Sequence, residues 1–207
     1  LMPEVDELYP SGSRARRAKA GPGVRLSLAL EHATKRVFAL PVRYAVLAHD
    51  FNDPAALTRR GAPHARAMCE VRRAEEMSAR LKVPLECRDA ARLAARWHRV
   101  VVRAPALQPA VLLGVINAAD ALRRPERLET MLHACECVVM SAPDAPDDFA
   151  PARYLLSALA VVKGVPAGAI ARTAAPGLAG STRADAIAKA IRSARLAALR
   201  AWKRAGA

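Results

Sequence analysis

The run Val42-Arg43-Tyr44-Ala45-Val46-Leu47-Ala48-His49-Asp50 is an apolar segment that ends in an imidazole beside a carboxylate. Its apolar residues predict a buried helix. The side chains of His49 and Asp50 offer two ligand chemistries that transition metals accept. The segment therefore predicts a helical fold with a small metal-binding corner at the end of this helix.

Further polar residues recur at distances that suit a site assembled from several helices. Arg25 lies 24 residues before the imidazole of the pair, and His64 lies 14 residues after its carboxylate. His98 and Asp120 are 22 residues apart on later helical segments. We expect these positions to converge in one helical bundle, because a metal with ligand distances near 2 Å needs its donors in one place.

The composition favours an all-α protein. The chain has 207 residues, of which 53% are hydrophobic and only 4% aromatic. Ala, Leu and Val dominate the apolar content, which suits close-packed helices better than sheets. No useful alternating pattern, internal repeat, signal peptide or run of 18 apolar residues is visible, so neither a strand-rich fold nor a membrane span is expected. Leu1 is an unusual first residue, which predicts a fragment of a longer chain.

Helical spacing and the positions of prolines predict the order of the helices. The expected helices are 26–38, 41–50, 65–81, 85–102, 109–122, 125–140, 152–163, 167–173 and 181–203. The side chains expected to face inward in the first and third of them include Val37, Met68, Val71, Met77 and Leu81. Pro143, Pro146 and Pro151 mark a loop at 141–151, which predicts a helical domain over 1–140 and a C-terminal helical region over 141–207.

The chain is strongly basic, with 33 Lys and Arg against 19 Asp and Glu and a net charge of +14. The expected helix 85–102 carries an arginine stripe, which consists of Arg88, Arg92, Arg96 and Arg99 at spacings of three or four residues. Few acidic residues lie near the stripe. It predicts a nucleic-acid partner, since guanidinium groups bind phosphates; a solvated helix face in an arginine-rich protein is the alternative.

The remaining cysteine, histidine and tryptophan residues have structural interpretations. Cys69, Cys87, Cys135 and Cys137 are expected to be buried reduced thiols, with a zinc site at Cys135-x-Cys137 as the alternative. His32 and His133 show no charged partner at ligand spacing and are expected at the surface or in helix packing. Trp97 and Trp202 are expected to anchor the core.

Five ordered blocks carry a resemblance to a known family. They are 2–6 (Met-Pro-Glu-Val-Asp), 43–50, 80–84 with 87–89, 120–127 (Asp-Ala-Leu-Arg-Arg-Pro-Glu-Arg) and 201–203. In order and spacing the chain resembles the C-terminal HD region of bacterial multifunctional CCA proteins, which are tRNA nucleotidyltransferases. The resemblance implies an HD-type helical bundle with additional C-terminal helices.

The resemblance also implies a metal-dependent phosphohydrolase site whose ligands are partly lost. His49 and Asp50 occupy the catalytic and metal-ligand pair of the family, and His64, His98 and Asp120 are further ligand positions. Arg25 stands where the family has its first ligand histidine, so a permanent cation replaces a neutral donor. Phe51-Asn52-Asp53-Pro54 replaces the family's Leu-Gly-Lys-Gly, and the family's later histidine is Val102.

The expected function follows from this partial match. The 207 residues contain no Gly-rich nucleotidyltransferase motif, so the chain alone is not expected to add nucleotides. We expect a cytoplasmic region of a CCA-adding enzyme, or a stand-alone derivative, that binds tRNA or another RNA and no membrane. Its phosphohydrolase activity is expected to be weakened or lost, with Arg25 paired to Asp50 or Asp120 and no cofactor bound. The alternative is an active enzyme that uses a divalent metal on 2′,3′-cyclic phosphates, 2′-nucleotides or phosphomonoesters.

Overall fold

The structure, a computed structural model, describes residues 22–48, 63–142, 144–176 and 179–206. Within these ranges the chain is all helical and contains no strand, which confirms the expected fold class. The elements are α2 (Pro22–Lys35), α3 (Leu40–Ala48), α5 (Pro63–Arg80), α6 (Leu85–Val101), η2 (Ala104–Ala106), α7 (Pro109–Ala118), α8 (Pro125–Met140), α9 (Ala150–Lys163), α10 (Ala167–Thr173) and α11 (Gly180–Arg204). Their order confirms the helices expected from the sequence, and α8 and α10 have the expected bounds.

Helix α6 is the centre of the N-terminal part of the bundle. Its small residues Ala90, Ala91, Ala94 and Ala95 are all buried and lie against α2, α3, α5 and α8. Alanine side chains let neighbouring helices approach closely on more than one side. Only a narrow strip of α6 is therefore left for long polar side chains.

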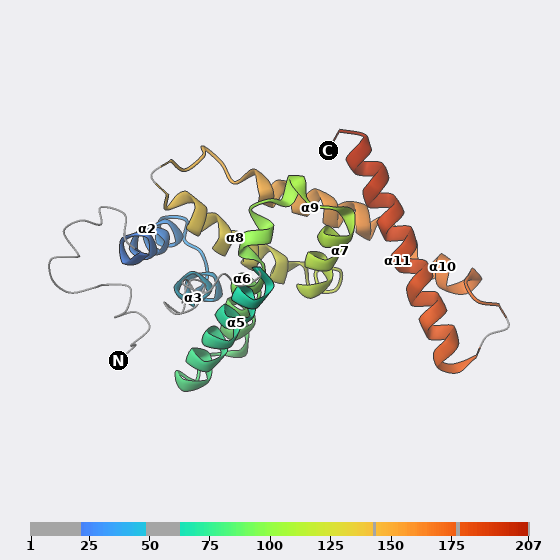
Figure 1. The fold of residues 1–207 in the computed structure, drawn as a ribbon, viewed down its shortest axis with the longest axis horizontal. Coiled ribbons are helices and arrows are strands. Elements are labelled where there is room, and N and C mark those ends of the chain that lie inside the picture. The colour runs from blue at the N-terminus through green and yellow to red at the C-terminus, as the bar shows by residue number, and fades with distance from the viewer. Residues whose placement is uncertain (1–21, 49–62, 143, 177–178, 207) are drawn as a thin grey trace.

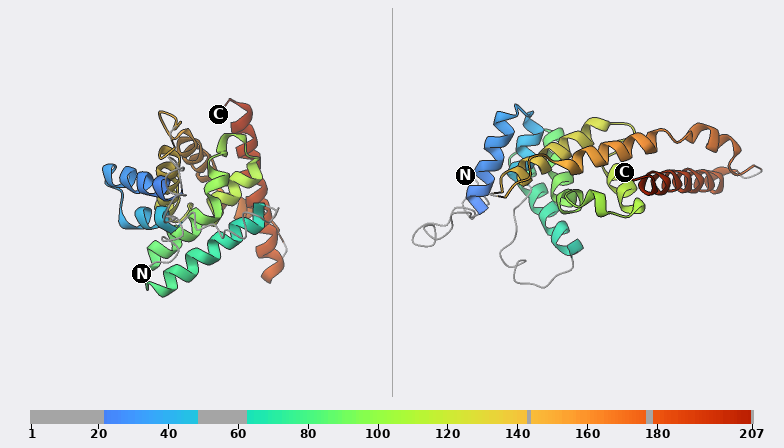
Figure 2. Two further views of the ribbon diagram at one scale, coloured as in Figure 1. Left: turned by 60° about the vertical axis from the view of Figure 1, so that its left-hand side comes forward. Right: turned by 90° about the horizontal axis from the view of Figure 1, so that it is seen from above.

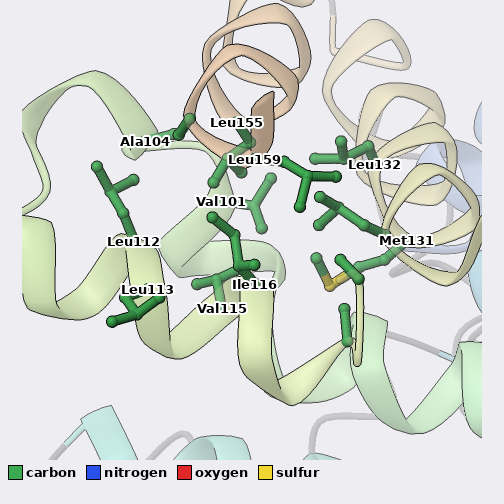
Figure 3. Close-up of a cluster of buried hydrophobic side chains, with 14 of the residues drawn as sticks. Val101, Ala104, Leu112, Leu113, Val115, Ile116, Met131, Leu132, Leu155 and Leu159 are labelled. Carbon is green, nitrogen blue, oxygen red and sulfur yellow. The ribbon is translucent and has the colours of Figure 1, made fainter. Parts of the chain in front are cut away.

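The largest core cluster lies between α6, α7, α8 and α9 (Figure 3). It contains Leu112 and Ile116 from α7, Met131 from α8 and Leu155 from α9, each 0% exposed. Trp97, Trp202 and Leu199 also contribute to it, so the tryptophans anchor the core as expected. Because this cluster joins residues on both sides of position 140, the division into 1–140 and 141–207 stays a prediction.

Helices α10 and α11 lie at the opposite end of the molecule from α2 and α3 (Figures 1 and 2). Only Leu199 of α11 is fully buried, and the helix packs on α7, α9 and α10. In the view from above, much of α11 lies beyond α7, alongside α10. This leaves most of a 25-residue helix accessible to a partner.

The stretch Ala150–Thr173 has the length and apolar character of a candidate membrane span. It consists of two helices, because α9 ends at Lys163 and Pro166 precedes α10. The 14 residues of α9 extend only about 21 Å, which is shorter than a hydrocarbon core of about 30 Å. Leu155, Ala158, Leu159 and Val162 of α9 are buried in the core, so we assign α9 to the core.

Several side chains near helix ends that were predicted to face inward are exposed. Val71 and Met77 are buried as expected, but Met68 is 47% exposed, Leu81 is 38% exposed and Val37 is 80% exposed. Val37 lies beyond the last residue of α2 and has a φ of 54°. The helical period no longer applies there, since a left-handed residue turns the chain away from the helix.

Candidate functional site

Only some of the predicted metal ligands lie within the residues that the structure describes. His49 and Asp50 lie outside the described residues, and for His64 only its place in the backbone of α5 is described. The remaining predicted ligands are His98 on α6 and Asp120 at the corner between α7 and α8. Within the described ranges, no three His, Cys, Asp or Glu side chains form a group able to hold a metal ion. A metal centre would therefore need donors from residues outside those ranges or from His64.

His98 has one ring nitrogen fixed by the backbone. Its Nδ1 lies 3.0 Å from the carbonyl oxygen of Ala94, one turn earlier on α6. Because a carbonyl only accepts, this contact requires a proton on Nδ1, and in the neutral ring Nε2 is then the acceptor nitrogen. Metal-ligating histidines commonly have this tautomer, so the chemistry of His98 is compatible with the predicted role.

Asp120 is bound by a neighbouring cation that the sequence analysis did not pair with it. The Nε and Nη2 atoms of Arg124 both lie 3.0 Å from Oδ2 of Asp120, at i,i+4 spacing. The guanidinium neutralises a carboxylate that the resemblance assigns to a metal. The i,i+4 spacing was visible in the sequence and is the signal that could have identified this pair.

Arg25 occupies an exposed position on α2 and has no ion pair with any residue that the structure describes. The predicted pairing of Arg25 with Asp120 is not present, because Asp120 pairs with Arg124. The alternative pairing with Asp50 lies outside the described residues. Replacement of a metal by Arg25 thus stays a prediction.

The arginine stripe of α6 is largely engaged by neighbouring side chains. Arg99 donates to Oε1 of Glu70 on α5 at 2.7 Å, and Glu70 is 1% exposed. Arg96 lies over the ring of Trp97, and Arg92 has Asp89 at 3.8 Å. Glu70 is an acidic partner that the sequence analysis missed, because it comes from another helix. Arg88 is exposed, with no ion pair among the described residues.

Helix α11 carries a second set of cations. It has seven Lys or Arg residues and one acidic residue, Asp185. Lys189, Arg192, Arg200 and Arg204 are exposed and have no ion pair within the described part of the chain. At 100° per residue these four fall within an arc of about 120° and extend along roughly 22 Å of the helix. The sequence analysis predicted this helix but did not identify its basic face.

The histidines and cysteines take structural roles in the described residues. His32 Nε2 lies 3.3 Å from Oε1 of Glu136, and this corrects the expectation that His32 has no charged partner. His133 stacks on Phe38 with ring centroids 4.4 Å apart. Cys87, Cys135 and Cys137 are buried, Cys69 is half-buried, and all four are free. Burial raises the pKa of both Cys135 and Cys137 to about 12, so these thiols are protonated at neutral pH.

Comparison with known proteins identifies the class of this helical bundle. No family model and no solved structure matches the chain. It is 35% identical over 98% of its length to the multifunctional CCA protein of Azoarcus sp. (strain BH72), and it covers 48% of that protein. It is 37% identical over 96% of its length to the one from Leptothrix cholodnii, and again covers 48%. The one from Dechloromonas aromatica is 38% identical over 83% of the chain.

The chain is therefore similar to multifunctional CCA proteins over nearly its whole length, and the resemblance seen in its sequence is confirmed. It spans about half the length of the curated relatives that it matches. This share is consistent with a C-terminal region of such a protein.

Proposed function

We propose that this chain is the tRNA-binding region of a CCA-adding tRNA nucleotidyltransferase, or a stand-alone derivative of that region. The observation that carries the proposal is the similarity to multifunctional CCA proteins over nearly the whole chain. The net charge of +14 supports a polyanionic partner. The cytoplasm, where tRNA is processed, is the proposed location.

The exposed cations of α11 support phosphate contacts. Lys189, Arg192, Arg200 and Arg204 lie on one face of a helix much of which lies beyond α7. None of them must break an ion pair with a described residue before it binds a phosphate. Their span of about 22 Å corresponds to roughly six base-pair steps, at about 3.4 Å of rise per step along a duplex axis. We therefore place the main RNA contact on α11.

The stripe of α6 is a secondary contact in this proposal. Arg88 and Arg92 are exposed, and Arg96 is half-buried. Arg99 is 43% exposed but is held by Glu70. A phosphate that recruits Arg99 would leave a buried carboxylate without its cation, which costs free energy. Arg88, Arg92 and Arg96 are thus the members of the stripe that RNA is expected to use.

We also propose that the HD phosphohydrolase activity is weakened or lost. Arg25 stands at a ligand position, and Asp120 is already neutralised by Arg124. At about 4 Å and an effective dielectric near 20, a cation at a ligand position opposes each metal charge by roughly 4 kcal/mol. In an intact site, a divalent metal would activate a water for attack on the phosphate. His49, Asp50, His64, His98 and Asp120 are the residues proposed to hold it.

Two measurements test these proposals separately. Binding of tRNA at about 50 mM salt is expected, and its absence would contradict RNA binding. Purified protein is expected to contain no stoichiometric divalent metal and to leave a 2′,3′-cyclic nucleotide intact. The Arg25→His variant should bind a divalent ion more tightly, because a neutral ligand replaces a cation. Full metal occupancy with hydrolysis in the unmodified protein would instead establish the active phosphohydrolase.

A further inference from the structure

The N-terminal ends of α3, α6 and α8 meet around a cavity of about 510 Å³. The lining residues comprise Pro41 of α3, six residues at and near the start of α6, and four residues at the start of α8. The volume is in the range of pockets that hold small organic ligands.

Three similar corners fix the walls of this cavity. Each of the three helices follows a corner whose turning residue has a left-handed φ, namely Val37 (54°), Lys82 (51°) and Asp120 (53°). A backbone hydrogen bond closes each corner: Phe38 N to Ala33 O at 3.0 Å, Val83 N to Ser78 O at 3.2 Å, and Ala121 N to Ile116 O at 3.0 Å. This is the Schellman arrangement, which ends a helix at a defined point. The cavity is therefore preformed by backbone geometry.

Both arginines that line the cavity are in ion pairs, but two of the lining glutamates are not. Arg124 is bound to Asp120 at 3.0 Å, and Arg127 lies 3.4 Å from Asp89. Glu86 and Glu126 have neither an ion pair nor a side-chain hydrogen bond to any residue in the described ranges. The charge that is left over at the cavity is negative, in a protein whose net charge is +14. At 0.15 M salt the distant cations are screened over about 8 Å, so the local carboxylates decide what the cavity attracts.

The floor of the cavity is apolar. Ala90 and Leu93 are almost fully buried beneath it, while Pro41, Pro84 and Leu85 form its side. Leu85 is 62% exposed, which leaves apolar surface available to a ligand. A ligand that matches these walls has an aliphatic body and at least one cationic end, because the body lies on apolar side chains while the cation reaches a carboxylate.

We propose that this cavity binds a small aliphatic amine, with its ammonium groups on Glu86 and Glu126 and its methylene chain on Leu85, Leu93 and the two prolines. Neither His98 nor Asp120 lines the cavity, although Asp120 pairs with the lining residue Arg124. The proposal does not rest on RNA binding. A diamine should bind more tightly than a monoamine, since two carboxylates are available.

Calorimetric titration of the full chain with 1,4-diaminobutane, and with n-butylamine for comparison, tests this proposal. We expect saturable binding with one diamine per chain. Glu86→Gln and Glu126→Gln should each weaken it about two- to five-fold, the range for single exposed charge pairs, and together about ten-fold. Leu85→Ser should weaken it as well. Glu129→Gln, an exposed position on α8 outside the cavity, is the matched control and should leave binding unchanged.

Two results would overturn the proposal. Acidic residues in a first helical turn also stabilise the helix dipole. If that is the only role of Glu86 and Glu126, the glutamine variants will melt at lower temperature while diamine binding is absent or unchanged. If inorganic phosphate binds in the cavity and displaces the diamine, Arg127 and the N-termini of α6 and α8, which have no side-chain cap, determine the ligand, and the site is an anion site. Thermal melting of each variant without ligand shows whether it remains folded.

Discussion

Helices α6 and α11 both carry rows of basic residues, but most cations of the first row are paired within the protein and those of the second row face outward. Helix α6 is at the centre of the bundle, and three of the four arginines of its stripe are held by Asp89, the ring of Trp97 and Glu70. Helix α11 is at one end, and four of its cations face outward without an ion pair in the described part of the chain. Sequence spacing alone does not separate these cases, because Glu70, the buried partner of Arg99, comes from another helix. Charge that is already compensated stabilises the fold, while uncompensated charge is available to a polyanion.

The largest effect that the comparison predicts is on stability. Arg99→Ala should lower the free energy of unfolding by about 2–4 kcal/mol, because Glu70 stays buried without this cation. The value is placed towards the low side of the range for broken buried pairs, since Arg99 is 43% exposed. Arg192→Ala on α11 is the control and should change stability by less than about 0.5 kcal/mol. Urea unfolding followed by circular dichroism measures both, and equal losses would remove the distinction between the helices.

A smaller effect is expected where α11 itself is anchored. Lys203 donates to the carbonyl oxygens of Pro105 at 3.0 Å and Leu107 at 2.6 Å. Lys203→Met keeps much of the aliphatic stem and removes the donor, and it should cost about 1–2 kcal/mol. Arg204→Met is the exposed neighbour for comparison and should be close to neutral. If both variants are neutral in urea unfolding, the end of α11 is not held by Lys203.

The smallest predicted effect concerns the exposed pair of Asp120 and Arg124 at the corner between α7 and α8. Arg124→Ala removes the partner of Asp120, and Arg124 is 55% exposed. Exposed pairs of this kind contribute about 0.2–1 kcal/mol, so thermal melting should shift only slightly. Arg123→Ala, at an exposed neighbouring position, provides the baseline. A loss above about 2 kcal/mol relative to that baseline would mean that Arg124 stabilises the corner by more than this pair.

Much of the fold was predictable because local signals agree with one another. Prolines mark the starts of α7, α8 and α9, and the helical periods of α6, α8 and α10 are clear. The wrong inward-facing assignments, Val37, Leu81 and Met68, lie beyond or near helix ends. No glycine marks the corners at Val37, Lys82 and Asp120, so their left-handed conformations were not visible in the sequence.

The site was less predictable because its contacts are between segments. Arg99 and Glu70 are 29 residues apart, and His32 and Glu136 are 104 apart. Neither separation follows a helical spacing, so only the packing of α5 on α6, and of α2 on α8, brings these pairs together. The Asp120–Arg124 pair is the exception, since its i,i+4 spacing is local. Convergence of His49, Asp50, His98 and Asp120 stays a prediction.

The most direct test is the salt dependence of tRNA binding by the unmodified chain and two triple variants of equal charge change. One is Arg88→Ala/Arg92→Ala/Arg96→Ala on α6, and the other is Lys189→Ala/Arg192→Ala/Arg200→Ala on α11. For about four neutralised phosphates, log K of the unmodified chain should fall with log salt at a slope of roughly −3 to −4. The α11 variant should flatten the slope by about 2–3 and weaken all tRNA sequences alike, while the α6 variant should flatten it by about 1 or less. A slope flattened equally or more by the α6 variant would contradict the account.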